Sequence, residues 1–148
     1  MELIVIASPC ELELVRNEFN RPNTRIIITG VGALNVYRAL SDIPRDTKII
    51  NIGYVGSVDI PIGTRVEIER CELYHPGVNY EENGFFLSEK GVTCYTGVDF
   101  VQNSNYKGCV FDMELAFICA MGFDVRSIKY VSDNCNYEEY ENTINNEN

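Results

Sequence analysis

The sequence predicts an α/β fold built on a mixed sheet. Apolar, β-branched runs alternate with short amphipathic segments, which is the pattern of strands and helices that share one core. Residues 64–96 contain two strand-like runs with no helical pattern between them, so the sheet is expected to be mixed rather than purely parallel. With 148 residues and 45% hydrophobic composition, the chain is expected to form one domain over residues 1–148.

The first part of the chain alternates strands with turns and helices. Residues 2–8 are expected to form a buried central strand because residues 3–6 are a continuous apolar run, and Pro9 ends the strand. Glu11 lies in the first turn of an amphipathic helix. Residues 30–32 and 53–56 carry paired glycines and are expected to form turns that let a ligand approach the backbone. The elements expected here are strands 2–8, 24–29 and 47–52 and helices 11–19 and 33–40.

The second part of the chain is expected to end in a strand that delivers an acid. Residues 111–114 are expected to open a helix, and Gly122 is expected to end it. Residues 127–131 read as a strand that leads to Asp133. Residues 136–148, rich in Asn and Glu, are expected to form a frayed helix or to be disordered. The other expected features are strands 64–74 and 92–96, a loop or hairpin at 76–90 and a loop at 97–104.

Charge and composition exclude several classes of partner. The net charge of −10 makes nucleic acid a poor partner, because such affinity comes largely from Lys and Arg. The acidity is otherwise explained by solubility. The apolar start of the chain is too short for a membrane span and lacks a basic segment, and no later run is long enough. We expect a cytoplasmic protein with no membrane partner.

Metal and cofactor chemistry is not expected. The six cysteines form no CxxC pair and His75 is the single histidine, so buried free thiols in a reducing compartment are favoured over zinc ligands or disulfides. The chain contains no GxGxxG and no GxxxxGK[ST] segment, which argues against dinucleotide and P-loop nucleotide sites. The sequence therefore predicts no metal and no cofactor.

Several acids fall at the ends of expected elements, where ligands bind in α/β folds. They have plain structural interpretations as well. Glu11 and Glu114 each fall in the first turn of an expected helix, where an acid stabilises the helix by about 0.3–1 kcal/mol without a catalytic role. The segment 132–134 is also typical of a turn after a strand, and Phe100 of a core position.

Collinear motifs over most of the chain resemble the nucleoside phosphorylase and nucleosidase superfamily, and within it the 5′-methylthioadenosine/S-adenosylhomocysteine nucleosidases. Each motif is weak alone, and their order gives the resemblance its specificity. The motifs are IASPCELELVR at 6–16, TGVG at 29–32, NIGYVG at 51–56, IGT at 62–64, YH at 74–75, DFV at 99–101, DME at 112–114 and SD at 132–133.

The resemblance implies a three-layer αβα sandwich around a mixed sheet, a homodimer, and hydrolysis of the N-glycosidic bond of a purine nucleoside. It implies that Glu11 activates the attacking water and that Asp133 serves the purine N7, with Ser132 beside it. An acid at the base and a carboxylate-activated water at the sugar act where charge develops as the bond breaks.

The resemblance also implies a set of substrate-binding residues. Met113 and Glu114 are expected to hold the ribose. Phe100 is expected to stack on the base, with Val101 beside it. The sugar and nucleophile side is expected to be lined by Val31 and Gly56.

Departures from the family pattern leave alternatives open. Hexameric phosphorylases place Arg and Ser where this chain has Asn51 and Tyr54, so water is favoured over phosphate as the nucleophile. Lys129 replaces the Arg usual in bacterial nucleosidases, Asp112 replaces a Glu, and the region between residues 75 and 92 and the end of the chain are short. A noncatalytic nucleoside-binding or regulatory protein is the second hypothesis, and a phosphate-dependent phosphorylase is the third.

Overall fold

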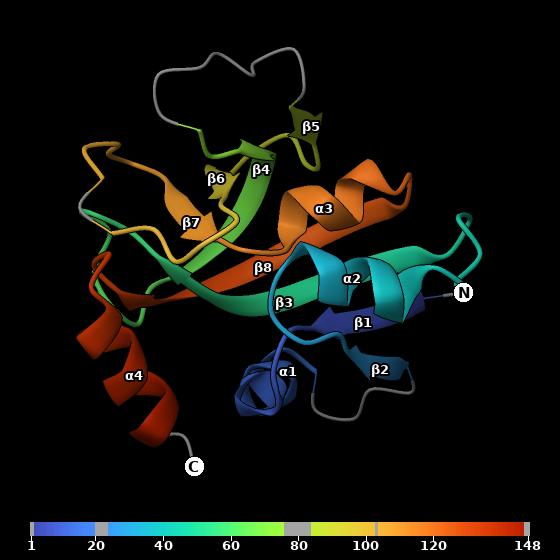
Figure 1. Cartoon of the computed structure of the whole chain (residues 1–148), viewed down its shortest axis with the longest axis horizontal. Coiled ribbons are helices and arrows are strands. Elements are labelled where there is room, and N and C mark those ends of the chain that lie inside the picture. The colour runs from blue at the N-terminus through green and yellow to red at the C-terminus, as the bar shows by residue number, and fades with distance from the viewer. Residues whose placement is uncertain (1, 20–23, 76–83, 103, 147–148) are drawn as a thin grey trace.

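The computed structural model describes residues 2–19, 24–75, 84–102 and 104–146 (Figure 1). Over these residues the strands join one sheet, and short helices lie around it. The strands are β1 Glu2–Ile6, β2 Arg25–Ile28, β3 Lys48–Gly56, β4 Arg65–Leu73, β5 Phe85–Phe86, β6 Val92–Thr96, β7 Val110–Asp112 and β8 Asp124–Asp133. The helices are the 3₁₀ turn η1 Pro9–Glu11, α1 Leu12–Glu18, α2 Ala33–Leu40, α3 Leu115–Ala120 and α4 Tyr137–Asn146.

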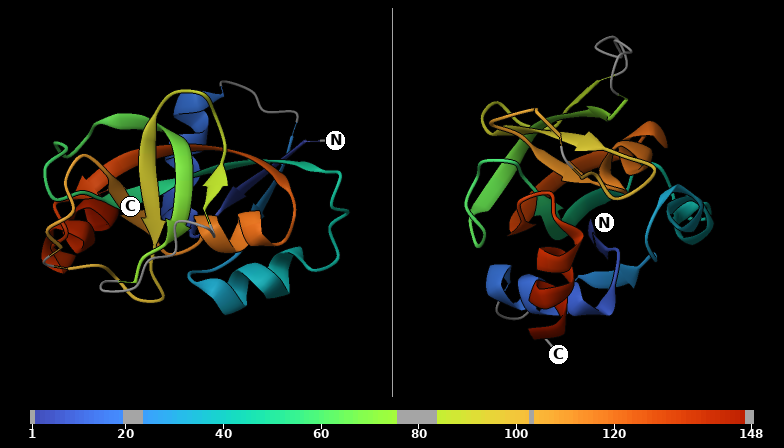
Figure 2. Two further views of the ribbon diagram at one scale, coloured as in Figure 1. Left: turned by 90° about the horizontal axis from the view of Figure 1, so that it is seen from above. Right: turned by 60° about the vertical axis from the view of Figure 1, so that its left-hand side comes forward.

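Strand β3 is the centre of the sheet because it pairs with three other strands. Its first half pairs in parallel with β1, and β1 pairs in parallel with β2. Its other edge pairs in parallel with β8 along the whole strand, and its last residue, Gly56, pairs with Phe111 of β7. β8 continues to β4, β4 to β6 and β6 to β7, so these strands and β3 close into a barrel-like ring. The arched course of β4 is visible in Figure 2.

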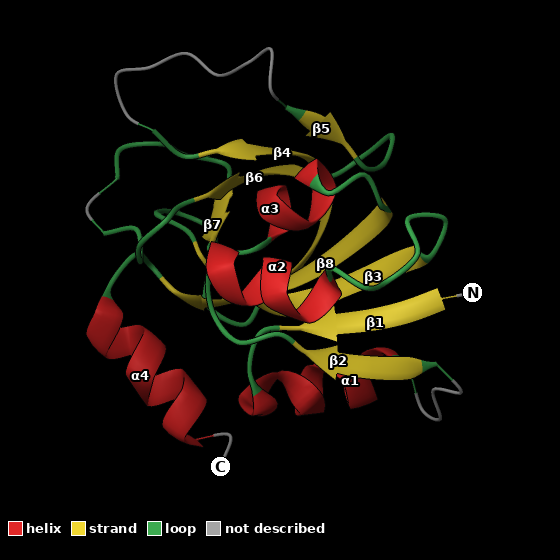
Figure 3. Ribbon diagram, turned by 45° about the vertical axis from the view of Figure 1, so that its right-hand side comes forward, coloured by secondary structure: helices red, strands yellow, loops and turns green. Residues whose placement is uncertain are grey.

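Alternating apolar residues of the strands pack on two faces of the sheet. Leu3 and Val5 of β1 belong to the core that α2 and α3 cover, whereas Ile4 and Ile6 belong to the core that α1 covers. Figure 3 shows α2 and α3 on one side of the sheet and α1 on the other. The prediction of a mixed α/β fold is confirmed. Because the sheet curls into a ring, the three-layer sandwich is not confirmed.

The glycine pair 53–56 does not form the expected turn, so that prediction is wrong. β3 runs through Gly53 to Gly56, and neither residue has a positive φ angle. The glycines are required for space: a Cβ on Gly53 would lie 2.6 Å from Glu11 Oε2, and one on Gly56 would lie 2.8 Å from Asp133 Oδ1. The turn at residues 30–32 is confirmed, since Gly30 and Gly32 have φ angles of 91° and 89° and α2 follows.

Two other element boundaries differ from the expectation. Residues 110–112 extend the sheet as β7 instead of opening a helix, because β6 offers them a parallel partner. α3 therefore begins at Leu115, with Glu114 as its N-cap residue. The tail expected to be frayed or disordered contains α4, and the loop expected at 76–90 lies outside the described residues up to position 83. None of the described helices is long and apolar enough to cross a membrane.

The fold makes a prediction about α3. Ile118 is fully buried in the core on the α2 and α3 face, so Ile118→Ala leaves a cavity and is expected to lower the free energy of unfolding by about 2–5 kcal/mol. Val98 is 74% exposed, and Val98→Ala is expected to change stability by less than about 0.5 kcal/mol. Urea denaturation measures both, and equal losses would contradict this placement of α3.

Candidate active site

A cavity of about 320 Å³ lies where β1, β3, β7 and β8 end, and α4 borders it. This volume is in the range of small-molecule sites, and the ends of strands are where such sites form in α/β folds. All of the residues predicted for the site line this cavity. They are Glu11, Val31, Gly56, Phe100, Val101, Met113, Glu114, Ser132 and Asp133.

Backbone donors fix the carboxylate of Glu11. Ser8 and Glu11 form a capping box at the start of η1, which turns the Glu11 side chain back toward the end of β1. Glu11 Oε1 accepts hydrogen bonds from the N–H groups of Ala7 (2.8 Å) and Ser8 (3.2 Å), and Oε2 accepts one from Tyr54 (2.7 Å). Burial raises the pKa of Glu11, while the Lys129 charge and these three donors oppose that shift. Glu11 is thus an oriented acceptor at the cavity wall.

Glu114 joins two distant segments at the cavity. Its Oε2 accepts a hydrogen bond of 2.8 Å from the N–H of Gly32, in the turn before α2. Burial raises the pKa of Glu114 well above 4.5, and the nearby charge of Asp112 raises it further. The Glu114 residue is partly exposed because it lines the cavity. Its carboxylate is nevertheless closely surrounded by protein atoms. It can accept hydrogen bonds from ligand hydroxyls with its remaining lone pairs.

Asp133 is held at the end of β8 by its immediate neighbours. Its Oδ2 accepts from Ser132 Oγ at 2.8 Å, and its Oδ1 accepts from the N–H of Cys135 at 2.8 Å. Cys135 has a φ of 63°, so the chain turns through the left-handed region directly after it leaves β8. Burial raises the pKa of Asp133, as a proton donor near neutral pH requires.

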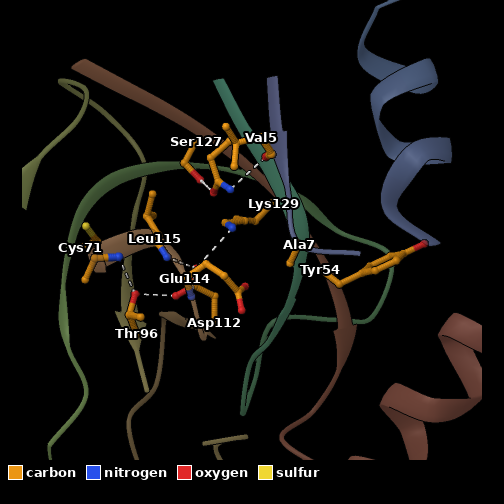
Figure 4. Close-up of polar contacts among 12 residues, drawn as sticks. Val5, Ala7, Tyr54, Cys71, Thr96, Asp112, Glu114, Leu115, Ser127 and Lys129 are labelled. Atoms are coloured by element: carbon orange, nitrogen blue, oxygen red, sulfur yellow. Dashed lines mark hydrogen bonds and ion pairs between the residues drawn. The ribbon is translucent and has the colours of Figure 1, made fainter. Parts of the chain in front are cut away.

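A buried network below the cavity was not predicted as a unit from the sequence. Asp112 accepts hydrogen bonds from Thr96 Oγ1 (2.5 Å) and from the N–H groups of Leu115 (2.7 Å) and Glu114 (3.3 Å). Lys129 Nζ lies 3.4 Å from Asp112 Oδ2, and both side chains are almost fully buried. Figure 4 shows Lys129 pointing toward Asp112, with Thr96 on the other side of that carboxylate. Asp112, the first residue of the DME motif at the end of β7, thus holds the backbone of Glu114 in place.

On the aromatic side of the cavity, Phe100 was predicted from the sequence, whereas Tyr137 and Tyr140 of α4 were not. Phe100 packs against Tyr137 and Tyr140 of α4, with ring centroids 5.3 Å and 5.4 Å apart. Thr143 Oγ1 donates a hydrogen bond of 2.8 Å to the carbonyl oxygen of Ser132, which ties α4 to β8. The signal in the sequence was the spacing of the two tyrosines, which puts them on one face of a helix.

No Lys or Arg is among the described residues that line the cavity, although Lys129 lies behind it. Asn51, which stands where phosphorylases carry a basic residue, points away into the sheet: its Nδ2 donates to Val5 O at 3.3 Å, and its Oδ1 accepts from Ser127 Oγ at 2.8 Å. In the part of the chain that the structure describes, no group of His, Cys, Asp and Glu residues is arranged to hold a metal ion.

Solved structures share this fold over nearly the whole chain. The MTAN of Chlamydia trachomatis bound to adenine has a TM-score of 0.73 and 18% identity, covering 99% of this chain and 88% of that one. The S-adenosylhomocysteine nucleosidase of Streptococcus pyogenes, in complex with 5-methylthiotubericidin, has a TM-score of 0.72 and 16% identity, covering 97% and 89%.

The 5′-methylthioadenosine/S-adenosylhomocysteine nucleosidase of Neisseria meningitidis, in complex with methylthio-immucillin-A, has a TM-score of 0.69 and 15% identity, covering 97% and 91%. No protein-family model and no curated protein sequence matches the chain. At these identities the likeness establishes the fold: this chain has the α/β fold of nucleosidases, and specifically the fold seen in 5′-methylthioadenosine/S-adenosylhomocysteine nucleosidases.

The site makes a prediction about stability and pH. Because the pKa of Glu114 is raised in the folded state, its stabilising contribution is complete below the unfolded value of 4.5 and is lost as pH rises through the folded pKa. Glu114→Gln removes this loss and can still accept from Gly32. We expect the variant to gain stability over the wild type, by about 1.4 kcal/mol per pH unit between the two pKa values.

Urea denaturation between pH 4 and pH 9 measures the effect. Glu13→Gln, at a half-exposed side chain on α1 that pairs with Arg16, is the matched control and is expected to change stability by less than about 1 kcal/mol. A stability difference between wild type and Glu114→Gln that is the same at every pH would contradict a buried, proton-binding Glu114.

Proposed function

We propose that the protein hydrolyses the N-glycosidic bond of a purine nucleoside of the 5′-methylthioadenosine or S-adenosylhomocysteine type. One observation carries the proposal: Glu11, Glu114 and Asp133 come from three distant parts of the chain and line one cavity. Pure binding of a neutral nucleoside does not require three buried carboxylates, whose desolvation is unfavourable. The nucleosidase fold agrees with this proposal.

Asp133 is proposed to protonate the leaving base. As the bond between the sugar and the base breaks, its electron pair goes to the purine, which becomes more basic at N7. Asp133 keeps its proton to a higher pH than an exposed acid because of burial, so it can donate at near-neutral pH. Ser132 Oγ donates to the other side of the carboxyl group and holds it in place.

Glu11 is proposed to accept a proton from the attacking water, whose oxygen forms the new bond to the sugar. Its two oxygens are oriented by backbone N–H groups, and the remaining lone pairs face the cavity. Glu114 and Met113 are proposed to hold the ribose hydroxyls and the sugar face. Phe100 and Val101 are proposed to contact the base, and Val31 and Gly56 to line the sugar side.

Water is proposed as the nucleophile rather than phosphate. Phosphate binding depends on Arg, Lys or converging backbone donors. The described cavity wall contains no basic side chain. The backbone N–H groups of Ala7 and Ser8, at the end of β1, already donate to Glu11.

The finer organisation is part of the same proposal. We propose a single domain that assembles as a homodimer, with helices layered on both sides of the sheet as in a three-layer sandwich. Exposed apolar side chains at and before α2 support the dimer: Leu34 is 78% exposed, Val31 46% and Tyr37 41%. No disulfide joins any of the six cysteines, all of which lie among the described residues, and this fits a cytoplasmic location.

The function is tested by incubating the protein with adenosine, inosine, 5′-methylthioadenosine and S-adenosylhomocysteine, with and without phosphate. Release of free base without phosphate is expected. Asp133→Asn is expected to lower that rate by about 10²–10⁴-fold, because it removes the proton donor. Chromatography of the free base measures both.

The control is Asp124→Asn, an exposed acid on the same strand that is expected to leave base release unchanged. Binding of nucleosides without any cleavage would replace the enzyme by a nucleoside-binding protein. A strict requirement for phosphate would instead identify a phosphorylase.

The dimer is tested by sedimentation velocity. The wild type is expected to sediment as a dimer, and Leu34→Glu as a monomer, because a charge would replace an apolar contact at α2. Ile62→Glu, at an exposed apolar residue outside α2, is the control and is expected to remain a dimer. A monomeric wild type would refute the dimer and leave the hydrolase unaffected.

A further inference from the structure

Among the described residues, the buried cation Lys129 lies close to acids that line the cavity. Lys129 is 1% exposed, and the charges that act on it come from Asp112, Glu11 and Glu114, together with the thiol of Cys94. Burial lowers the pKa of Lys129, but these neighbours raise it overall, so the ammonium is charged. A charge in this environment must be compensated by groups within a few ångströms.

Asp112, the ion-pair partner of Lys129, has other hydrogen-bond donors as well. Asp112 already accepts from Thr96 Oγ1, from Leu115 N–H and from Glu114 N–H, and its contact with Lys129 Nζ, at 3.4 Å, is the longest of the four. The carboxylate of Asp112 is therefore largely satisfied by neutral donors. The charge of Lys129 remains available to the other acids nearby.

Gly53 opens the space between Lys129 and Glu11. A Cβ built on Gly53 would lie 2.6 Å from Glu11 Oε2 and 3.4 Å from Lys129 Nζ. The carboxylate and the ammonium thus approach the same point above β3, one from η1 and the other from β8. A side chain at position 53 would collide with the Glu11 carboxylate and displace it.

We propose that Lys129 is a positioning residue for the hydrolysis: across the bare backbone of Gly53, its ammonium holds the Glu11 carboxylate ionised and in place to accept the proton of water. The inference rests on the proposed function for its catalytic meaning. Its electrostatic content, the pairing of a particular lysine with a particular glutamate, is independent of any reaction.

The other titratable groups around Glu11 show that Lys129 is the positive charge that acts on it. The charge of Glu11 acts on Glu114 at the start of α3 and on Tyr140 of α4, and Cys10 precedes Glu11 on η1. None of these is cationic, and within the described surroundings of Glu11 Lys129 supplies the positive charge. Of the influences that lower the pKa of Glu11 against burial, the Lys129 charge is the largest, ahead of the backbone donors.

The test compares the pH dependence of base release in the wild type, Lys129→Met and Lys129→Arg. Without the cation the ionised form of Glu11 is disfavoured, so the acid limb of the kcat profile is expected to move to higher pH by about one unit or more. Lys129→Arg is expected to restore the limb, because it restores the charge. Lys48→Met, at an exposed position on β3, is the control and is expected to leave the profile unchanged.

A second readout needs no turnover. In protein labelled with ¹³C at the glutamate carboxyl carbons, the Glu11 signal is assigned by its loss in Glu11→Gln and followed through a pH titration. The Glu11 midpoint is expected to rise in Lys129→Met and to return in Lys129→Arg. If Lys129→Met does not fold, the double variant Asp112→Asn/Lys129→Met removes the buried pair together, and the same rise is expected.

The outcomes separate this inference from the proposed function. An unchanged Glu11 midpoint in the folded variants, or a uniform loss of rate with no movement of the acid limb, overturns the role of Lys129. A wild type that releases no base from any nucleoside overturns the hydrolase, while the carbon titration still decides whether Lys129 controls Glu11.

Discussion

The approach of two carboxylates to the bare backbone of β3 is the constraint on which the rest of the site depends. Glu11 lies against Gly53 and Asp133 against Gly56, each where a Cβ would collide with a carboxylate oxygen. Both acids can therefore be buried beside the central strand without displacing it. Because β3 pairs with β1, β7 and β8, its position sets the positions of every other strand that borders the cavity.

The three acids at the cavity differ in what surrounds them, and this difference changes how readily each one holds a proton. Glu11 has three backbone donors and the nearby charge of Lys129, Glu114 has one backbone donor, and Asp133 is held by the Ser132 hydroxyl and the backbone N–H groups of Cys135 and Asn136. More donors favour the ionised form, and burial favours the protonated form. Under the proposed function, a proton acceptor and a proton donor share one site because their surroundings differ, as in enzymes that use paired carboxylates.

Sequence reasoning reached the strands and the acids but misjudged what the glycines do. A glycine can be needed for a positive φ angle, as at Gly32, or for space, as at Gly53, and the sequence alone does not distinguish these. The start of α3 was misplaced because the strand partner of residues 110–112 lies on β6, which local patterns do not show. The part of Tyr140 in the cavity wall was missed since it depends on a tertiary contact with Phe100.

The side chains of β8 alternate between two environments, so the strand cannot gain or lose a residue without harm. Ile128 faces the α1 core, and the next residue, Lys129, lies among the acids, so successive residues of one strand serve packing and charge. A one-residue insertion within β8 before position 128 would turn Lys129 toward the α1 core and Ile128 toward the acids. The ammonium would then be buried among aliphatic side chains, and Asp133 would move away from Gly56. Insertions and deletions are therefore expected to be tolerated in loops outside β8 rather than within it, because the length of the strand is as constrained as the identity of its residues.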